Sequence, residues 1–187
     1  ASKKMILVGV NPPNQIEQRW LNDLAMDDSV VVFTETTSNL HHKDFFASID
    51  KMIAPLTDEE FKQLQPDILI TFGGLIISKK VKAFLRQYQP KQHWHIDENK
   101  ANNTFFCLEK HIEVHPNIFF TDFLPKITHF VKSDYKTYWE SIKQMRNKKH
   151  DEFTKDAVFS DFKVFDTLLK SLPNDSILQV GNSSAVR

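Results

Sequence analysis

The stretch PDILITFGGLIISKKVKAFLRQYQ, residues 66–89, constrains the fold of this chain more than any other. Its apolar run at 68–72 is rich in β-branched residues, which is typical of a parallel strand buried on both faces. The glycine pair 73–74 predicts a tight turn, and Ser78 can cap the helix that follows. The stretch therefore predicts a strand, a turn and a helix that returns along the sheet.

The same alternation extends over the chain. Parallel strands joined by helices form right-handed crossovers and a doubly wound sheet. We therefore predict a three-layer α/β fold with a mostly parallel sheet. Short apolar pieces between 105 and 120 are expected as edge strands or turns. Strands are predicted at 4–10, 30–33, 68–72, 92–96 and 176–180, and helices at 14–26, 44–52, from 57 onward, 78–89, 133–155 and 161–172.

All four glycines lie at the carboxyl ends of predicted strands. They are Gly9, Gly73, Gly74 and Gly181. In open α/β sheets, ligands bind at the carboxyl edge, at the point where the strand order reverses. The glycine positions therefore predict a ligand site at this edge.

Lys79 and Lys80 begin the helix after the glycine pair. Cations are mildly unfavourable there, because a helix N-terminus already carries the positive end of the dipole. Two lysines at such a place suggest an anionic partner, and the alternative is a pair of solvated surface side chains.

Composition excludes several classes. The chain has 187 residues, which predicts one domain spanning 1–187, and its 24 basic and 24 acidic side chains argue against non-specific nucleic-acid binding. We find no signal peptide and no apolar run long enough to span a membrane. The single cysteine, Cys107, excludes an internal disulfide and is consistent with a cytoplasmic protein. Because the chain starts with Ala1 and stops just after a predicted strand, we expect a piece of a longer protein.

Standard motifs are absent. The first turn reads GVNPPN, residues 9–14, instead of a dinucleotide fingerprint, and there is no P-loop or GxSxG elbow. His93, His95 and Asp97 lie on one face of a predicted strand. They are interpreted as structural, with a metal site as the alternative. Cys107 is interpreted as buried and inert.

The final segment, ILQVGNSSAVR, places polar groups after a predicted strand. Asn182, Ser183 and Arg187 are its candidate ligand-binding residues. Backbone amides, hydroxyls and a guanidinium at a strand end can bind a carboxylate. The alternative is a polar loop with a free arginine.

Taken together, PDILITFGGLIISKKVKAFLRQYQPKQHWHID and LQVGNSSAVR resemble the thiamine-diphosphate enzyme of menaquinone biosynthesis, 2-succinyl-5-enolpyruvyl-6-hydroxy-3-cyclohexene-1-carboxylate (SEPHCHC) synthase. The resemblance covers nearly the whole chain, although its specific motifs are short. It implies the Rossmann-like central domain of a three-domain, homodimeric or homotetrameric transferase.

The resemblance also implies an activity. The family decarboxylates 2-oxoglutarate on thiamine diphosphate and adds the succinyl unit to isochorismate. The cofactor and Mg²⁺ are held by the other two domains of the polypeptide. This chain lacks the activating glutamate and the GDG metal motif, so the resemblance implies that it is inactive alone and holds no catalytic, cofactor or metal residue.

By motif, Lys79 and Lys80 match the family's basic pair facing isochorismate, and Ser183 and Arg187 match residues that hold a substrate carboxylate. Asn182 shapes that turn. Lys80 stands where arginine is common, which puts bidentate binding in doubt. Two alternatives stay open. One is a nucleotide-binding middle domain for FAD or ADP, disfavoured by the first turn and by the lack of a suitably placed acidic residue. The other is a purely structural domain.

Overall fold

The computed structural model describes residues 2–124 and 132–179. The chain divides into two compact units, residues 1–143 and 144–187, and the division falls within one long helix. Each unit is described by itself.

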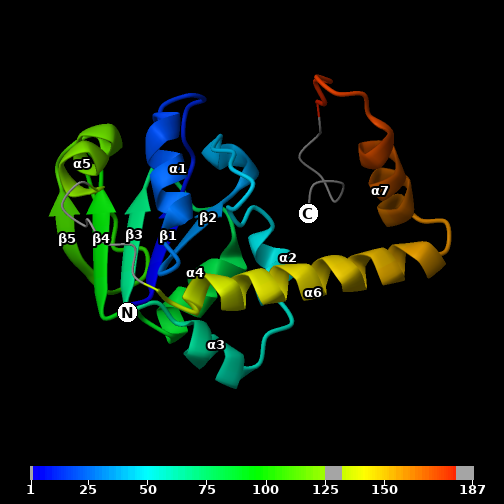
Figure 1. Cartoon of the computed structure of the whole chain (residues 1–187), viewed down its shortest axis with the longest axis horizontal. Helices are drawn as coiled ribbons and strands as arrows, with labels where there is room; N and C mark the ends of the chain where they lie inside the picture. The colour runs from blue at the N-terminus through cyan, green and yellow to red at the C-terminus, as the bar shows by residue number, and fades with distance from the viewer. Residues whose placement is uncertain (1, 125–131, 180–187) are drawn as a thin grey trace. The chain divides into compact units, whose positions relative to one another are not determined.

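The first unit is built on a five-stranded, fully parallel sheet (Figure 1). The strand order is β2-β1-β3-β4-β5, which is the doubly wound arrangement that the alternating pattern predicted. Its order reverses between β1 and β3, so this pair forms the topological switch point. The strands are β1 (Lys4–Val8), β2 (Val30–Thr34), β3 (Ile68–Phe72), β4 (Gln92–Ile96) and β5 (Leu108–Ile112).

Helices cover both faces of the sheet and give the three predicted layers. On one face the core contains side chains from α2, α3, α4 and the start of α6. On the other it contains side chains from α1 and α5. The helices are α1 (Gln18–Met26), the 3₁₀ turn η1 (Thr36–Ser38), α2 (Ile49–Ile53), α3 (Asp58–Leu64), α4 (Lys79–Gln87), α5 (Pro116–Phe123), α6 (Tyr135–Asp156) and α7 (Asp161–Ser171).

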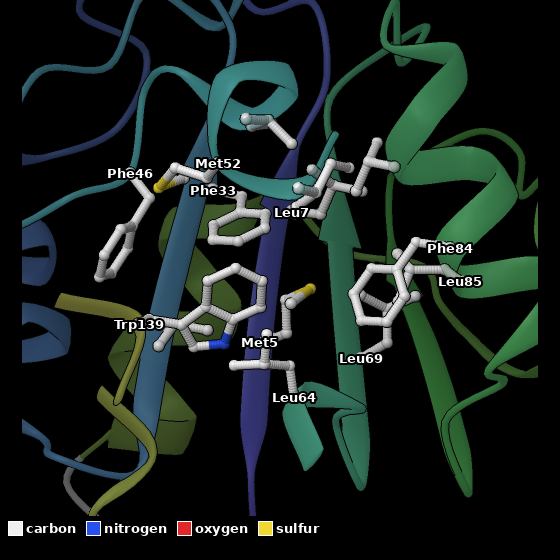
Figure 2. Packing of buried hydrophobic residues seen from close by; sticks show 14 of the residues in the cluster. Met5, Leu7, Phe33, Phe46, Met52, Leu64, Leu69, Phe84, Leu85 and Trp139 are labelled. Atoms are coloured by element: carbon white, nitrogen blue, oxygen red, sulfur yellow. The ribbon is translucent and has the colours of Figure 1, made fainter. Parts of the chain in front are cut away.

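The core beneath α4 and α6 is aromatic. Figure 2 shows the Trp139 indole over side chains that project from β1 and β2. Its ring packs edge-on against Phe33, with centroids 4.8 Å apart and planes at 82°. Trp139 and Phe33 are both fully buried. Such edge-to-face pairs stabilise a core beyond the area that they bury.

Local chemistry sets several helix starts as predicted. Thr57 and Glu60 form a capping box at α3: the Thr57 hydroxyl accepts from the Glu60 amide, and the Glu60 carboxylate accepts from the Thr57 amide. At α4, the Ser78 hydroxyl accepts from the Val81 amide at 3.1 Å. The predicted Ser78 cap is confirmed, and Thr57 caps the helix that was predicted from 57 onward.

Other expectations were wrong. The apolar piece around 118–120 lies in helix α5, not in a strand or turn, because Pro116 starts the helix and His115 accepts a hydrogen bond from the Asn117 amide. Helix α1 begins later than predicted, at Gln18, because Glu17 before it is extended, and Asn14 takes a left-handed conformation. In α6, Tyr135, Trp139 and Ile142 are buried, whereas Met145 is exposed.

The second unit contains the end of α6 and helix α7. His150 and Lys170 both pair with Asp166, at 3.0 and 2.8 Å. Residues 176–179 of the predicted strand are irregular, since no described strand pairs with them, and residue 180 lies outside the described part. None of the helices in 2–124 and 132–179 is long and apolar enough to cross a membrane.

Candidate functional site

The switch point between β1 and β3 is closed by backbone. Gly9 and Gly74 approach so closely that a Cβ on Gly9 would lie 2.1 Å from the Gly74 carbonyl oxygen. The Gly74 amide donates to the Val10 carbonyl at 2.7 Å, which ties the two loops together. The loops after β1 and β3 therefore fill the place where the strand order predicted a ligand.

Glu35 occupies the next position along this edge, at the end of β2. It follows β2 directly, and its carboxylate accepts hydrogen bonds from the Ile77 and Ser78 amides at 2.8 and 2.6 Å. In dinucleotide-binding folds an acidic residue in this region binds the ribose. The expectation that no suitably placed acidic residue is present was therefore wrong, since Glu35 stands directly after β2. Because its oxygens are already engaged, it does not favour a nucleotide site.

Lys79 and Lys80 lie in the first turn of α4, and both are exposed. Neither forms an ion pair with a residue of the described chain. The helix start is instead neutralised by Glu35 and by Asp50, whose carboxylate accepts from the Ser78 hydroxyl. The two ammonium groups are therefore free of described partners and open to solvent.

An open cavity lies one strand further along, at the carboxyl ends of β3 and β4. Its volume is about 280 Å³. It exists because residues 97–107 join two parallel strands without a helix, where a packed crossover helix is usual. The lining residues are Thr71, Phe72, Gly73, Gly74, Leu75 and Ile76 after β3, and His93, His95, Asp97, Lys100, Asn102, Thr104 and Phe105 from β4 and its loop.

The loop that walls this cavity is held firmly. Arg86 donates from Nε to the Thr104 carbonyl at 2.9 Å, and the Gln89 amide donates to the Phe105 carbonyl at 3.1 Å. Both side chains come from α4 and the residues just after it. Within the loop, Asn103 accepts from the Leu108 amide at 2.9 Å. These bonds preorganise the cavity wall.

Two histidines and a threonine form the polar floor of the cavity. The Thr71 hydroxyl lies 2.9 Å from Nε2 of His93 and 2.8 Å from Nδ1 of His95. His93 is 1% exposed, and burial lowers its pKa to about 4. Burial also lowers the pKa of His95, although the Asp97 charge opposes this. Both rings are therefore neutral at neutral pH.

The HxHxD run lines this cavity but does not form a metal centre. Within the described residues, no group of three His, Cys, Asp or Glu side chains could hold an ion. His93 and His95 share Thr71 instead, as the structural interpretation expects. Cys107 is partly buried, and burial raises the pKa of its thiol, which suits an unreactive side chain.

The remaining predicted site residues, Asn182, Ser183 and Arg187, lie outside the described part of the chain. Sequence reasoning also missed the contribution of Thr71 and of residues 100–105. The two-residue period of β3 could have placed Thr71 on the same face as Leu69. The loop carries no periodic pattern that would have indicated a cavity.

These features define a parallel, doubly wound α/β domain with an open cavity at the carboxyl edge of its sheet. No protein-family model matches the chain. It is similar over its full length to SEPHCHC synthases, at 51% identity in Flavobacterium psychrophilum, 50% in Flavobacterium johnsoniae and 49% in Christiangramia forsetii. The chain belongs to this synthase family.

The similarity covers all of this chain but only part of each relative. The chain spans 34% of the two Flavobacterium synthases and 33% of the Christiangramia enzyme.

Proposed function

We propose that this chain is the central part of a SEPHCHC synthase and that it supplies contacts to substrate carboxylates. The observation that carries the proposal is the exposed Lys79–Lys80 pair, which has no ion-pair partner in the described chain. It stands at the carboxyl edge of the sheet, where α/β domains bind ligands. Cations do not stabilise a helix start, and Glu35 and Asp50 already complement the positive end of its dipole, so the lysines do not stabilise the helix there.

The proposed substrates are 2-oxoglutarate and isochorismate, each of which carries two carboxylates. Lysine binds such groups as a point charge, without the fixed geometry of arginine. We assign Lys79 and Lys80 to isochorismate, and Ser183 and Arg187, with Asn182 shaping their turn, to a substrate carboxylate.

Thiamine diphosphate and Mg²⁺ supply the decarboxylation chemistry when bound. The described residues do not fit the metal, since none of their His, Cys, Asp and Glu side chains cluster with ligand geometry. We therefore assign the binding of the cofactor to other parts of a cytoplasmic polypeptide, and we assign no step of the decarboxylation to this chain. We expect the chain alone to be inactive.

The chain is also proposed to pack against the rest of the enzyme and within a homo-oligomer. The second unit supports this, because helix α7 exposes several large apolar side chains. Isolated exposed apolar residues are ordinary, but a series along one helix is typical of a contact surface. They include Phe162, Phe165, Leu168 and Leu169, which are 46%, 38%, 53% and 57% exposed.

The test is steady-state kinetics on the protein that carries this chain. We expect Lys79→Ala and Lys80→Ala each to lower kcat/KM for isochorismate about tenfold or more, because a charge-assisted contact contributes roughly 1.5–3 kcal/mol. Arg187→Ala should have an effect of the same size. Thiamine-diphosphate affinity should not change.

Lys62→Ala is the matched control, because Lys62 is exposed on α3. If the Lys79 and Lys80 variants behave like it, the chain is a structural spacer. If the wild-type protein forms no isochorismate adduct, the proposed activity is wrong.

A further inference from the structure

The cavity beside β3 and β4 is separate from the lysine pair, since neither Lys79 nor Lys80 lines it. We propose that it binds a small planar amide or lactam, whose carbonyl oxygen accepts a hydrogen bond from His95 and whose N–H donates to Asp97. Four observations support this assignment: an unpartnered buried nitrogen, a directed hydrogen-bond chain, a local negative charge and the cavity's size.

The unpartnered nitrogen of His93 fixes the direction of the hydrogen bonds between His93, Thr71 and His95. Nδ1 of His93 is buried and has no hydrogen-bond partner in the described structure. A buried N–H without an acceptor is rarer than an unused acceptor, so the His93 proton belongs on Nε2. From there it donates to the Thr71 hydroxyl at 2.9 Å.

The Thr71 hydroxyl in turn fixes the direction of its hydrogen bond with His95. Its hydroxyl has one proton, and the two imidazoles are its described hydrogen-bond partners. Since it accepts from His93, it donates to Nδ1 of His95 at 2.8 Å. A neutral imidazole that accepts at Nδ1 carries its proton on Nε2, so His95 presents an N–H donor in the cavity.

Asp97 supplies the acceptor. Its Oδ1 accepts from the Asn99 and Lys100 amides at 2.8 and 3.0 Å, which leaves Oδ2 for a ligand. Burial raises the pKa of this carboxyl, but the two backbone hydrogen bonds and the nearby histidines lower it below its ordinary value overall. At Oδ2 the charged Asp97 carboxylate therefore favours an N–H donor and disfavours a ligand carboxylate, although the exposed Lys100 ammonium also lines the cavity.

The size of the cavity and its apolar wall narrow the class of ligand further. A volume of about 280 Å³ is just below the usual range of ligand pockets and suits a small molecule of one or two rings. Ile76 and Phe105 add apolar wall, against which a flat ring can pack. Amides and lactams combine such a ring with a carbonyl beside an N–H.

The experiment compares three molecules of one shape. Benzamide, benzoate and acetophenone are titrated into the whole chain, and dissociation constants are measured by ligand-observed NMR. Benzamide offers both the acceptor and the donor, acetophenone offers the acceptor alone, and benzoate is an anion. We expect benzamide to bind at least about tenfold more tightly than either, since one hydrogen bond to a charged group discriminates by that factor or more.

Two variants locate the site. Asp97→Asn should reduce the preference for benzamide over benzoate about tenfold, whereas Glu98→Gln, the same charge change one residue away and outside the cavity lining, should leave it unchanged. His95→Phe should weaken both benzamide and acetophenone.

Three results would overturn the proposal: no binding of benzamide, benzoate binding as tightly as benzamide, or identical behaviour of the two carboxylate variants. If Asp97→Asn does not fold, the wild-type comparison of the three molecules decides alone.

Discussion

Two crevices lie at the same edge of one sheet, and one is closed by its loops while the other is open. Between β1 and β3 the glycine-containing loops touch, with the Gly74 amide bonded to the Val10 carbonyl at 2.7 Å. Between β3 and β4 a cavity of about 280 Å³ stays open. Strand order alone predicts a ligand at the first crevice. The difference teaches that the connecting loops, and not the topology, decide which crevice can accept a ligand.

The largest expected effect comes from the closed crevice. Gly9→Ala places a Cβ 2.1 Å from a backbone oxygen, which cannot move aside as a flexible side chain would. We expect a loss of about 3 kcal/mol or more in the free energy of unfolding, measured by urea titration.

Gly74→Ala is the matched control for that substitution. The contacts of a Cβ there begin at 3.5 Å, so the loss should stay within about 1 kcal/mol. Equal stabilities of the two variants would show that the loops of the closed crevice are not in tight contact.

His93, in the floor of the open crevice, should make the free energy of unfolding depend on pH. The unfolded His93 side chain takes up a proton near pH 6.5, whereas the folded one does so near pH 4, because burial disfavours its charge. Between these values the unfolded state binds more protons, so stability falls as pH falls. With 1.36 kcal/mol per pKa unit, His93 should contribute a loss of about 3 kcal/mol by pH 4.

The measurement is the unfolding free energy of the wild type and of His93→Gln at several pH values over this range. The variant should lose less stability on acidification than the wild type. Parallel curves would mean that His93 is not buried as a neutral ring.

Glu35→Gln should have a smaller effect than Gly9→Ala or the protonation of His93. It keeps a side-chain oxygen near the Ile77 and Ser78 amides but removes the charge that complements the start of α4. We expect a loss of about 1 kcal/mol in thermal or urea unfolding. Glu98→Gln, on an exposed loop residue, should change stability less; if the two variants are equal, the Glu35 contacts contribute nothing.

The sequence predicted what depends on neighbouring residues. Strand 68–72 and the Ser78 cap follow from local apolar pattern and capping chemistry, and both are present. The expected strand at 176–180 is irregular over 176–179, because a strand needs partners that a local pattern cannot reveal. The cavity was not predicted, since it depends on how an aperiodic loop packs.

The candidate site was predicted in part for the same reason. Lys79 and Lys80 could be placed at a helix start because the preceding turn is encoded locally. The contact between Thr71 and His93 joins residues 22 positions apart, so spacing along one strand could not reveal it.

The most direct measurement of the central contrast is a backbone amide NMR titration of the whole chain with benzamide. We predict chemical-shift changes at Thr71, His95 and residues 97–105, around the open cavity, with Gly9 and Glu35 unaffected. Changes centred on Gly9 and Glu35, with the 97–105 loop silent, would contradict the account, because they would place the binding site at the crevice described as closed.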